Sequence, residues 1–229
     1  MKHLTHGFIV FLSTLIISHP CHAQARVCFF AGGQTTTVNY AIENVKQPAN
    51  SKFGIHGGVG MKVNFENHLY FFPSISYYQF GYDVSFNHKS IPPDSFAKDN
   101  SVSIHQLNID PVLQYDIGKN PSHFFLRAGP SFHFIISATE KFNTETGGFV
   151  NRKMEVGMYE DYGRILVSFV PAVGYESASG FYCNFQYTLG LINMCNADGG
   201  PRILERMAGL TVGYYLKNKK IVIDTRNRE

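Results

Sequence analysis

The stretch from Arg164 to Met194 most constrains what this chain can fold into, because apolar residues occupy every second position on both sides of a turn at residues 177–180. The apolar positions are Ile165, Val167, Phe169, Pro171, Val173 and Tyr175 before the turn, and Phe181, Cys183, Phe185, Tyr187, Leu189 and Leu191 after it. The positions between them carry mostly small or polar residues. Successive side chains of a strand point to opposite faces, so this pattern predicts a β-hairpin with one apolar and one polar face.

The length of the two strands separates a membrane protein from a soluble one. Strands of soluble sandwiches usually run about 5–6 residues, whereas each of these strands runs about 11 or more, the length that a tilted strand needs to cross a bilayer. Apolar residues facing lipid and polar residues facing a wet or hydrogen-bonded interior are the pattern of a transmembrane barrel. The hairpin therefore predicts a membrane β-barrel.

The first 23 residues read as a secretory signal peptide. Lys2 provides the positive start, residues 8–17 form a short apolar run, and residues 21–23 resemble a cleavage site. Lipidation of Cys21 is the alternative, which residues 18–20 disfavour because they do not match the small, apolar residues expected before a lipidated cysteine.

Composition agrees with export and excludes some functions. Removing the signal lowers the net charge from +3 to +2, because it removes one lysine and no acid. This charge does not favour binding to nucleic acid. Aromatic residues make up 14% of the chain without any tryptophan, as aromatic girdles at two membrane interfaces would require. No later stretch is apolar for long enough to form a transmembrane helix.

The rest of the chain adds strand candidates on both sides of the hairpin. They cover residues 26–40, 52–65, 69–86, 102–117, 123–139 and 203–216. Short connections at 66–68, 118–122 and 177–180 alternate with longer polar ones at 40–51, 87–101, 140–162 and 196–202. Transmembrane barrels have short periplasmic turns and long outer loops. We therefore predict an all-β, eight-stranded antiparallel up-and-down transmembrane β-barrel over residues 24–216, followed by a polar tail at 217–229.

Four prolines within the predicted strands argue against uninterrupted pairing. Pro73, Pro111, Pro130 and Pro171 each lack the N–H that a sheet ladder uses. We expect bulges or local bends at these positions.

Three cysteines remain after signal cleavage. Cys28 and Cys183 are predicted on strands separated by a third strand, which places them beyond the roughly 7 Å Cα limit for a disulfide. Cys183 and Cys195 are predicted toward opposite ends of one strand. We predict no disulfide within the barrel wall.

Several charged residues fall on the inward face by their position in the alternation. They are Lys62, Asp110, Asp116, Arg127 and Glu176. The interior of an eight-stranded barrel is just wide enough for side chains to fill it, so a porin-like channel is not expected. Isolated charges in such an interior are costly. We predict a lumen ionic network that rigidifies the barrel, with a gate or narrow solute path as the alternative.

The sequence gives little support for catalysis or metal binding. Ser131 and His133 share one strand face, as in a lipid hydrolase, but this follows from their spacing, and no acid or oxyanion motif accompanies them. The histidines show no metal-ligand spacing. We predict no enzymatic activity, no cofactor and no metal.

Two long connections are candidates for partner binding, because loops carry variation and binding in such scaffolds. Residues 140–162 mix charged and aromatic side chains that could contact a partner or a surface glycan, and residues 87–101 form the other long connection. A mobile, solvated loop is the interpretation that we favour for residues 140–162.

Short motifs with recurring prolines and tyrosines give the chain a resemblance to a known group. The motifs are Phe72-Pro73-Ser74-Ile75-Ser76-Tyr77, Pro111-Val112-Leu113-Gln114-Tyr115, Phe124-Phe125-Leu126-Arg127-Ala128-Gly129-Pro130-Ser131, Gly174-Tyr175 and Leu210-Thr211-Val212-Gly213-Tyr214-Tyr215. Over residues 26–216 they resemble the small outer-membrane β-barrel domain of the PorT-like group of Gram-negative bacteria. The resemblance implies an OmpA- or OmpX-like barrel in the cell outer membrane, surrounded by outer-membrane lipid and inserted by the barrel assembly machinery. Gly209, Val212 and Tyr214 resemble the C-terminal signal of that machinery, although Met207 stands where a polar residue is expected.

The expected function is a structural, adhesive or surface-binding one with a closed, side-chain-filled lumen. One branch of the resembled group implies the first alternative, a component of a type IX secretion or gliding apparatus. The second alternative is an outer-membrane lipid-modifying hydrolase.

Overall fold

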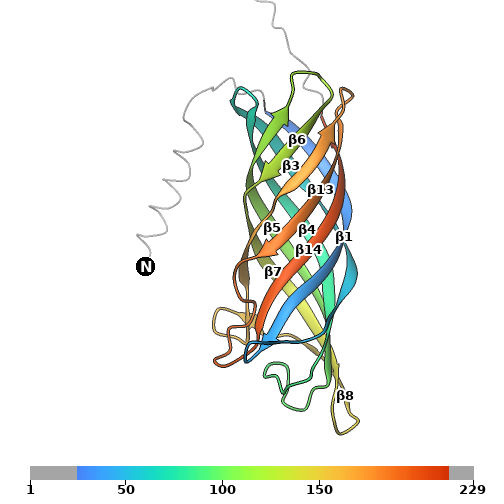
Figure 1. The fold of residues 1–229 in the computed structure, drawn as a ribbon, viewed down its shortest axis with the longest axis vertical. Coiled ribbons are helices and arrows are strands. Elements are labelled where there is room, and N and C mark those ends of the chain that lie inside the picture. The colour runs from blue at the N-terminus through green and yellow to red at the C-terminus, as the bar shows by residue number, and fades with distance from the viewer. Residues whose placement is uncertain (1–24, 217–229) are drawn as a thin grey trace, which may run out of the picture.

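The computed structural model describes residues 25–216, which form a single antiparallel β-barrel (Figure 1). Its strands are β1 (Arg26–Ile42), β2 (Val45–Lys46), β3 (Ala49–Glu66), β4 (Leu69–Ser85), β5 (Asp99–Ile117), β6 (His123–Ala128), β7 (Pro130–Asn143), β8 (Phe149–Lys153), β9 (Val156–Gly157), β10 (Tyr162–Gly163), β11 (Ile165–Phe169), β12 (Ala172–Glu176), β13 (Phe181–Gly190) and β14 (Arg202–Tyr215). Within these residues no helix is long and apolar enough to cross a membrane. The predicted signal peptide and C-terminal tail lie outside the described residues.

Eight barrel strands close into a ring, which confirms the predicted fold class. β6 and β7 together form one barrel strand, and β11 and β12 form another. The ring runs β1, β3, β4, β5, β6/β7, β11/β12, β13, β14 and returns to β1 through the pairing of β14 with β1. All eight predicted strands are present, and several extend beyond the predicted ends.

The register shows how the barrel closes. Residues of each barrel strand are paired with residues of the next strand, so a row of paired residues can be followed around the ring. When the register is continued through the short gaps at the prolines, the row that starts at Arg206 of β14 returns at Leu216, the residue that follows β14. The row is therefore displaced by ten residues in one circuit. Such a stagger requires strands that are tilted relative to the barrel axis, typically by about 35–45°.

The two ends of the barrel differ in their connections (Figure 1). At one end, which we call the turn end, short turns join β3 to β4, β5 to β6 and β12 to β13. At the other, the loop end, longer connections contain β2, β8, β9 and β10. The described chain starts and finishes at the turn end.

The polarity of both faces inverts part-way along β5. Its outward side chains from the turn end are Ile117, Tyr115, Leu113, Pro111, Ile109 and Leu107, and those that follow are His105, Ser103, Ser101 and Asp99. Its inward side chains are Asp116, Gln114, Val112, Asp110, Asn108 and Gln106, and those that follow are Ile104, Val102 and Asn100. The outward face therefore changes from apolar to polar where the inward face changes from mainly polar to apolar.

The same inversion occurs on the neighbouring strand β4. On β4 the outward residues are apolar from Leu69 to Tyr77 and polar or small from Gln79 onward. The inward residues change from the polar Ser74 and Ser76 to apolar residues that include Phe80. The apolar outward stretch of β4 spans nine residues from Leu69 to Tyr77, the length of about 9–11 that a tilted strand needs to cross a bilayer.

These patterns correct one prediction. Apolar-outward alternation holds for the part of the barrel next to the turn end, but beyond it the barrel continues as a β-structure with a polar outside and an apolar core. The core near the loop end contains Tyr40, Tyr78, Phe80, Tyr82, Val102, Ile104, Ile135, Leu166, Met194, Ile203 and Met207. We call this part, which projects past the apolar band, the barrel extension.

Three of the four prolines lie on one row of neighbouring strands. Pro73 pairs directly with Pro111, and the continued register places Pro111 opposite Pro130. Pro171 lies in the interruption between β11 and β12, and Pro130 follows the interruption at Gly129. The expected local irregularities are therefore present at Pro130 and Pro171, whereas Pro73 and Pro111 remain within continuous strands.

The core of the barrel extension should contribute to stability as a soluble core does. Replacing the fully buried Ile104 by alanine is expected to cost about 2–5 kcal/mol of unfolding free energy, since it leaves a cavity. Replacing its outward neighbour Ser103 by alanine should change the unfolding free energy by less than about 0.5 kcal/mol. Denaturant titration in lipid vesicles measures both, and equal costs would contradict the inversion.

Candidate functional site: the lumen clusters and the loop-end platform

Ionisable side chains gather inside the barrel near the turn end. Lys62 of β3 places its Nζ 2.6 Å from Asp116 Oδ2 of β5 and 2.8 Å from Glu176 Oε2 of β12. All three side chains are at most 5% exposed. Buried carboxylates of this kind require a cationic partner, and one ammonium group serves both.

Two further side chains complete this turn-end cluster. Arg26 Nη1 donates to Glu176 Oε1 at 2.6 Å. His123 lies on β6, where it pairs with Glu176 of β12, and its Nε2 is 3.0 Å from Asp116 Oδ2. The turn-end cluster thus consists of Arg26, Lys62, Asp116, His123 and Glu176.

Arg127 lies deeper in the lumen and makes no carboxylate ion pair within the described residues. Its guanidinium donates to Gln114 Oε1 at 2.7 Å and stacks 3.5 Å from the centroid of the Phe72 ring. Gln114 in turn donates to Asp116 Oδ1 at 2.7 Å. The amide of Gln114 therefore connects Arg127 to the turn-end cluster.

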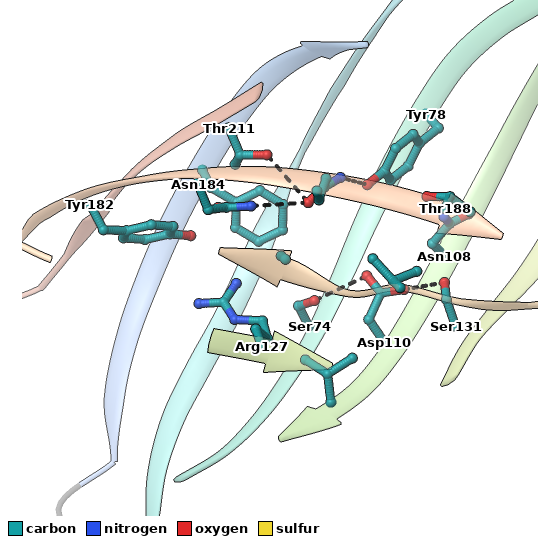
Figure 2. A pocket seen from close by; sticks show the side chains of 15 residues that line it. Ser74, Tyr78, Asn108, Asp110, Arg127, Ser131, Tyr182, Asn184, Thr188 and Thr211 are labelled. Atoms are coloured by element: carbon teal, nitrogen blue, oxygen red, sulfur yellow. Dashed lines mark hydrogen bonds between the residues drawn. The ribbon is translucent and has the colours of Figure 1, made fainter. Parts of the chain in front are cut away.

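A second cluster crosses the middle of the lumen. Figure 2 shows Asp110 between Ser74 and Ser131, both of which donate hydrogen bonds to its carboxylate. On the other side of Ser131, His133 Nε2 lies 2.8 Å from its Oγ, and His133 Nδ1 lies 2.6 Å from Glu205 Oε1 of β14. We call these residues, together with Ser168, which donates to Glu205, the mid-lumen cluster.

The order Ser131–His133–Glu205 resembles a catalytic triad, but its hydrogen bonds have the wrong direction for one. The single hydroxyl proton of Ser131 is donated to Asp110, so Ser131 Oγ accepts from His133 Nε2. A general base must instead accept the serine proton. The three side chains are at most 2% exposed and face the lumen rather than the lipid. This arrangement suits a buried ion pair better than hydrolysis.

Arg127 offers a test of how the lumen contributes to stability. Replacing Arg127 by alanine is expected to lower the unfolding free energy by about 1.5–3 kcal/mol, because it removes charge-assisted hydrogen bonds and leaves Gln114 Oε1 without a donor. Heat-modifiability on a gel should show earlier melting in detergent, with Ser179→Ala in the exposed turn as control. Unchanged melting would count against this role.

At the loop end, two connections fold against each other. Lys98 N donates to Asn143 O at 2.8 Å, and Glu145 N donates to Phe96 O at 2.8 Å. Arg152 of β8 donates to Pro93 O at 2.8 Å. We call residues 86–98 together with 143–153 the loop-end platform; its β7–β8 hairpin projects beyond the ring (Figure 1).

The base of this platform is fixed by a buried carboxylate. Glu140 is 1% exposed and accepts hydrogen bonds from Arg152 Nε at 2.7 Å and Asn100 Nδ2 at 3.1 Å. Tyr162 also donates to it, at 3.2 Å. Burial, and after it the Glu140 carboxylate, raises the pKa of the Tyr162 phenol well above its usual range, so that this group stays a neutral donor.

Residues 140–162 therefore contain more regular structure than the loop that we expected, while most of their side chains after residue 148 are exposed, as expected of a solvated segment. They continue β7 to Asn143 and form β8, β9 and the start of β10. Exposed apolar side chains remain on the platform, among them Ile91, Phe96 and Phe149.

The structure divides the predicted ionic residues between two places. Lys62, Asp116 and Glu176 lie in direct contact, Arg127 reaches them through Gln114, and Asp110 belongs to the mid-lumen cluster. Arg26, His123, His133 and Glu205 were not predicted as part of any network. The inward position of Glu205 could have been read from the alternation of Ile203, Glu205 and Met207 on β14.

The cysteines lie on different sides of the wall. Cys28 is buried in the lumen, Cys183 is exposed on the outer face, and Cys195 is buried within the connection between β13 and β14. All three are free thiols.

Comparison with known protein families agrees with this architecture. The family model described as outer membrane protein beta-barrel domain matches residues 22–196. The search of curated proteins gave no match. Similar solved structures include Ail of Yersinia pestis in complex with the heparin analogue sucrose octasulfate, at 10% identity and a TM-score of 0.44, covering 84% of this chain and 99% of Ail. They also include neisserial surface protein A, at 10% identity and a TM-score of 0.44 with 82% and 96% covered, and OprG of Pseudomonas aeruginosa, at 14% and 0.43 with 86% and 98% covered.

Proposed function

Because the chain belongs to the outer membrane protein beta-barrel domain family, it resides in the outer membrane, and we propose that it is a closed barrel which presents the loop-end platform at the cell surface for attachment. Long loops of such barrels face outward and short turns face the periplasm. This orientation places the platform outside the cell and the turn-end cluster at the periplasmic mouth. The narrower PorT-like grouping stays a prediction.

The observation that carries the proposal is the packing of the barrel extension. Tyr40, Tyr82 and Tyr162 are at most 2% exposed and fill the interior near the loop end together with the rest of its apolar core. On the turn-end side of this core, the cavity shown in Figure 2 has a volume of about 30 Å³, which is room for about one water molecule. A solute path through the barrel would have to pass through this core.

The platform supports a binding role because it is folded and still exposes apolar rings. Phe96 and Phe149 are 51% and 65% exposed on two segments that hydrogen bond to each other. Lys89 Nζ lies 5.5 Å from the centroid of the Phe96 ring. Two exposed aromatic rings, one of them beside an ammonium group, suit the stacking and polar contacts that sugar rings offer, so we propose surface carbohydrate as the ligand class.

Whole-cell adhesion tests this proposal. Gram-negative cells that display the protein are expected to bind immobilised glycans, and the double variant Phe96→Ser/Phe149→Ser should bind about tenfold less, because two contact rings are lost. Val45→Ser, an exposed apolar residue in the separate β1–β3 connection, is the control at equal surface expression. Equal binding by wild type and double variant would contradict the proposal.

Conductance tests the closed lumen separately. The purified barrel in a planar bilayer should give no stable single-channel current above that of the lipid alone, since the apolar core blocks the axis. Steady channels in the wild type would contradict a closed lumen without bearing on the platform.

The two alternatives receive no support from the comparisons. Capture of secretion-machinery subunits by the tagged barrel would favour the first. Lipid A altered in a Ser131-dependent way would favour the hydrolase, despite the hydrogen-bond directions described above.

A further inference from the structure

We propose that the turn-end cluster is a binding site for one zinc ion, with Asp116, His123 and Glu176 as its ligands and Lys62 as the cation that holds the place when zinc is absent. The three side chains come from neighbouring barrel strands β5, β6 and β12. Asp116 Oδ2, His123 Nε2 and a Glu176 oxygen all lie within 4.8 Å of one another.

The orientation of His123 points to this site. Its Nδ1 lies 3.0 Å from the carbonyl oxygen of Asn120, to which an Nδ1–H donates. Donation from one ring nitrogen to a backbone carbonyl is how metal-binding histidines are held, and it leaves the lone pair on the other nitrogen. That nitrogen, Nε2, is buried, lacks a hydrogen-bond partner in the described part of the chain, and faces carboxylate oxygens at 3.0 and 3.7 Å.

A lone pair directed at two carboxylate oxygens is repulsive unless a positive centre lies between them. The Lys62 ammonium and a proton on Nε2 are two such centres, and a metal ion that replaces the ammonium is a third. Zinc accepts histidine nitrogen and carboxylate oxygen at about 2.0–2.2 Å, so ligand atoms around it are about 3.4 Å apart. The observed separations of 3.0 and 3.7 Å lie on either side of that spacing.

Lys62 shows that a cation fits between the carboxylates, and it is also the competitor of zinc. Its Nζ contacts the same Asp116 and Glu176 oxygens that face His123. Arg26 holds the remaining Glu176 oxygen, Oε1, at 2.6 Å. Zinc binding would therefore require the Lys62 ammonium to leave, because two cations at one position repel each other.

The site has an opening through which both exchanges could occur. A pocket of about 790 Å³ at the turn end is lined by Asp116 and His123 and also by Glu66, His68 and Tyr70. Lys62 already lies 4.3 Å from the Tyr70 ring centroid, and Glu66 supplies an acidic group in the same pocket. The released ammonium could move into this pocket.

The test is zinc titration of the full, refolded barrel in detergent micelles after treatment with a chelator. Isothermal titration calorimetry should show one zinc per chain for the wild type, and Co²⁺ as a substitute should give visible d–d absorption from bound nitrogen and oxygen ligands. His123→Asn should weaken zinc binding by about 30-fold or more, since a ligand is lost. His68→Asn, which changes a histidine of the same pocket outside the ligand set, should stay within about twofold of the wild type.

Lys62→Met separates competition from simple structure. Removing the competing ammonium should tighten zinc binding by about tenfold, and heat-modifiability on a gel verifies that each variant is folded. If Lys62→Met does not fold, the two histidine variants decide alone. Absence of binding by the wild type at about 1 mM zinc, a dissociation constant that corresponds to only −4.1 kcal/mol, or equal losses in both histidine variants, would overturn the proposal.

Discussion

Replacing Leu210 by arginine is expected to destabilise the folded barrel by about 2–4 kcal/mol, the cost of a charge on the lipid face near the bilayer midplane. Leu210 lies on the outward face of β14 and is 66% exposed in the absence of lipid. The next outward residues of the same strand, Val212 and Tyr214, are also apolar. The partner of Leu210 on β13 is the equally outward Phe185. The wall around Leu210 is therefore apolar on both strands, and an arginine there can reach water only by distorting the lipid.

The matched control is Ser103→Arg on β5. Ser103 also faces outward and is exposed, but it lies on the polar wall of the barrel extension, where an added charge stays in water. We expect it to change the unfolding free energy by less than about 0.5 kcal/mol. Reversible denaturant titration in vesicles measures both variants. Similar costs at Leu210 and Ser103 would mean that the apolar band does not end where the outward polarity changes.

The strand order and the antiparallel ring were predictable because they follow from local alternation and from the lengths of the connections. Each turn-side half of a strand, such as Leu107 to Ile117 on β5, has a strict two-residue period that a barrel in lipid imposes. The barrel extension has the same two-residue period, but there the outward residues are polar and the inward residues are apolar. Alternation alone does not say which face is inward, so the change at Ile104 was not recognised as the end of the membrane-facing wall.

The partners inside the lumen could not be predicted because they depend on strands far apart in the sequence. His133 and Glu205 are separated by 72 positions but meet across the lumen at 2.6 Å. Lys62 and Glu176 are 114 positions apart. Parity places such residues on the inward face, but the stagger of the ring decides which of them are at the same height. That stagger depends on the register of all eight barrel strands together.

The mid-lumen ion pair should show strong coupling between its members. Changing Glu205 alone to methionine is expected to cost about 3–5 kcal/mol, because His133 and the Ser168 hydroxyl lose a buried acceptor. Changing His133 alone to leucine should cost a similar amount, about 3–5 kcal/mol, since it leaves Glu205 charged without its cationic partner. Both residues are at most 2% exposed, so water cannot replace the lost contact without entering the lumen.

The double variant His133→Leu/Glu205→Met should cost much less than the sum of the two single changes. Removing both partners of a buried pair and filling the space with apolar side chains of similar size is often close to neutral. Denaturant titration of the four proteins gives a coupling free energy, which we expect to exceed about 2 kcal/mol in favour of the pair. Additive costs would mean that the two side chains act independently and that the imidazole ring is not the counter-charge of Glu205. Strong coupling, by contrast, requires Glu205 to be ionised and the Nδ1–H of His133 to donate to it, so that the two side chains stabilise the barrel as one buried pair.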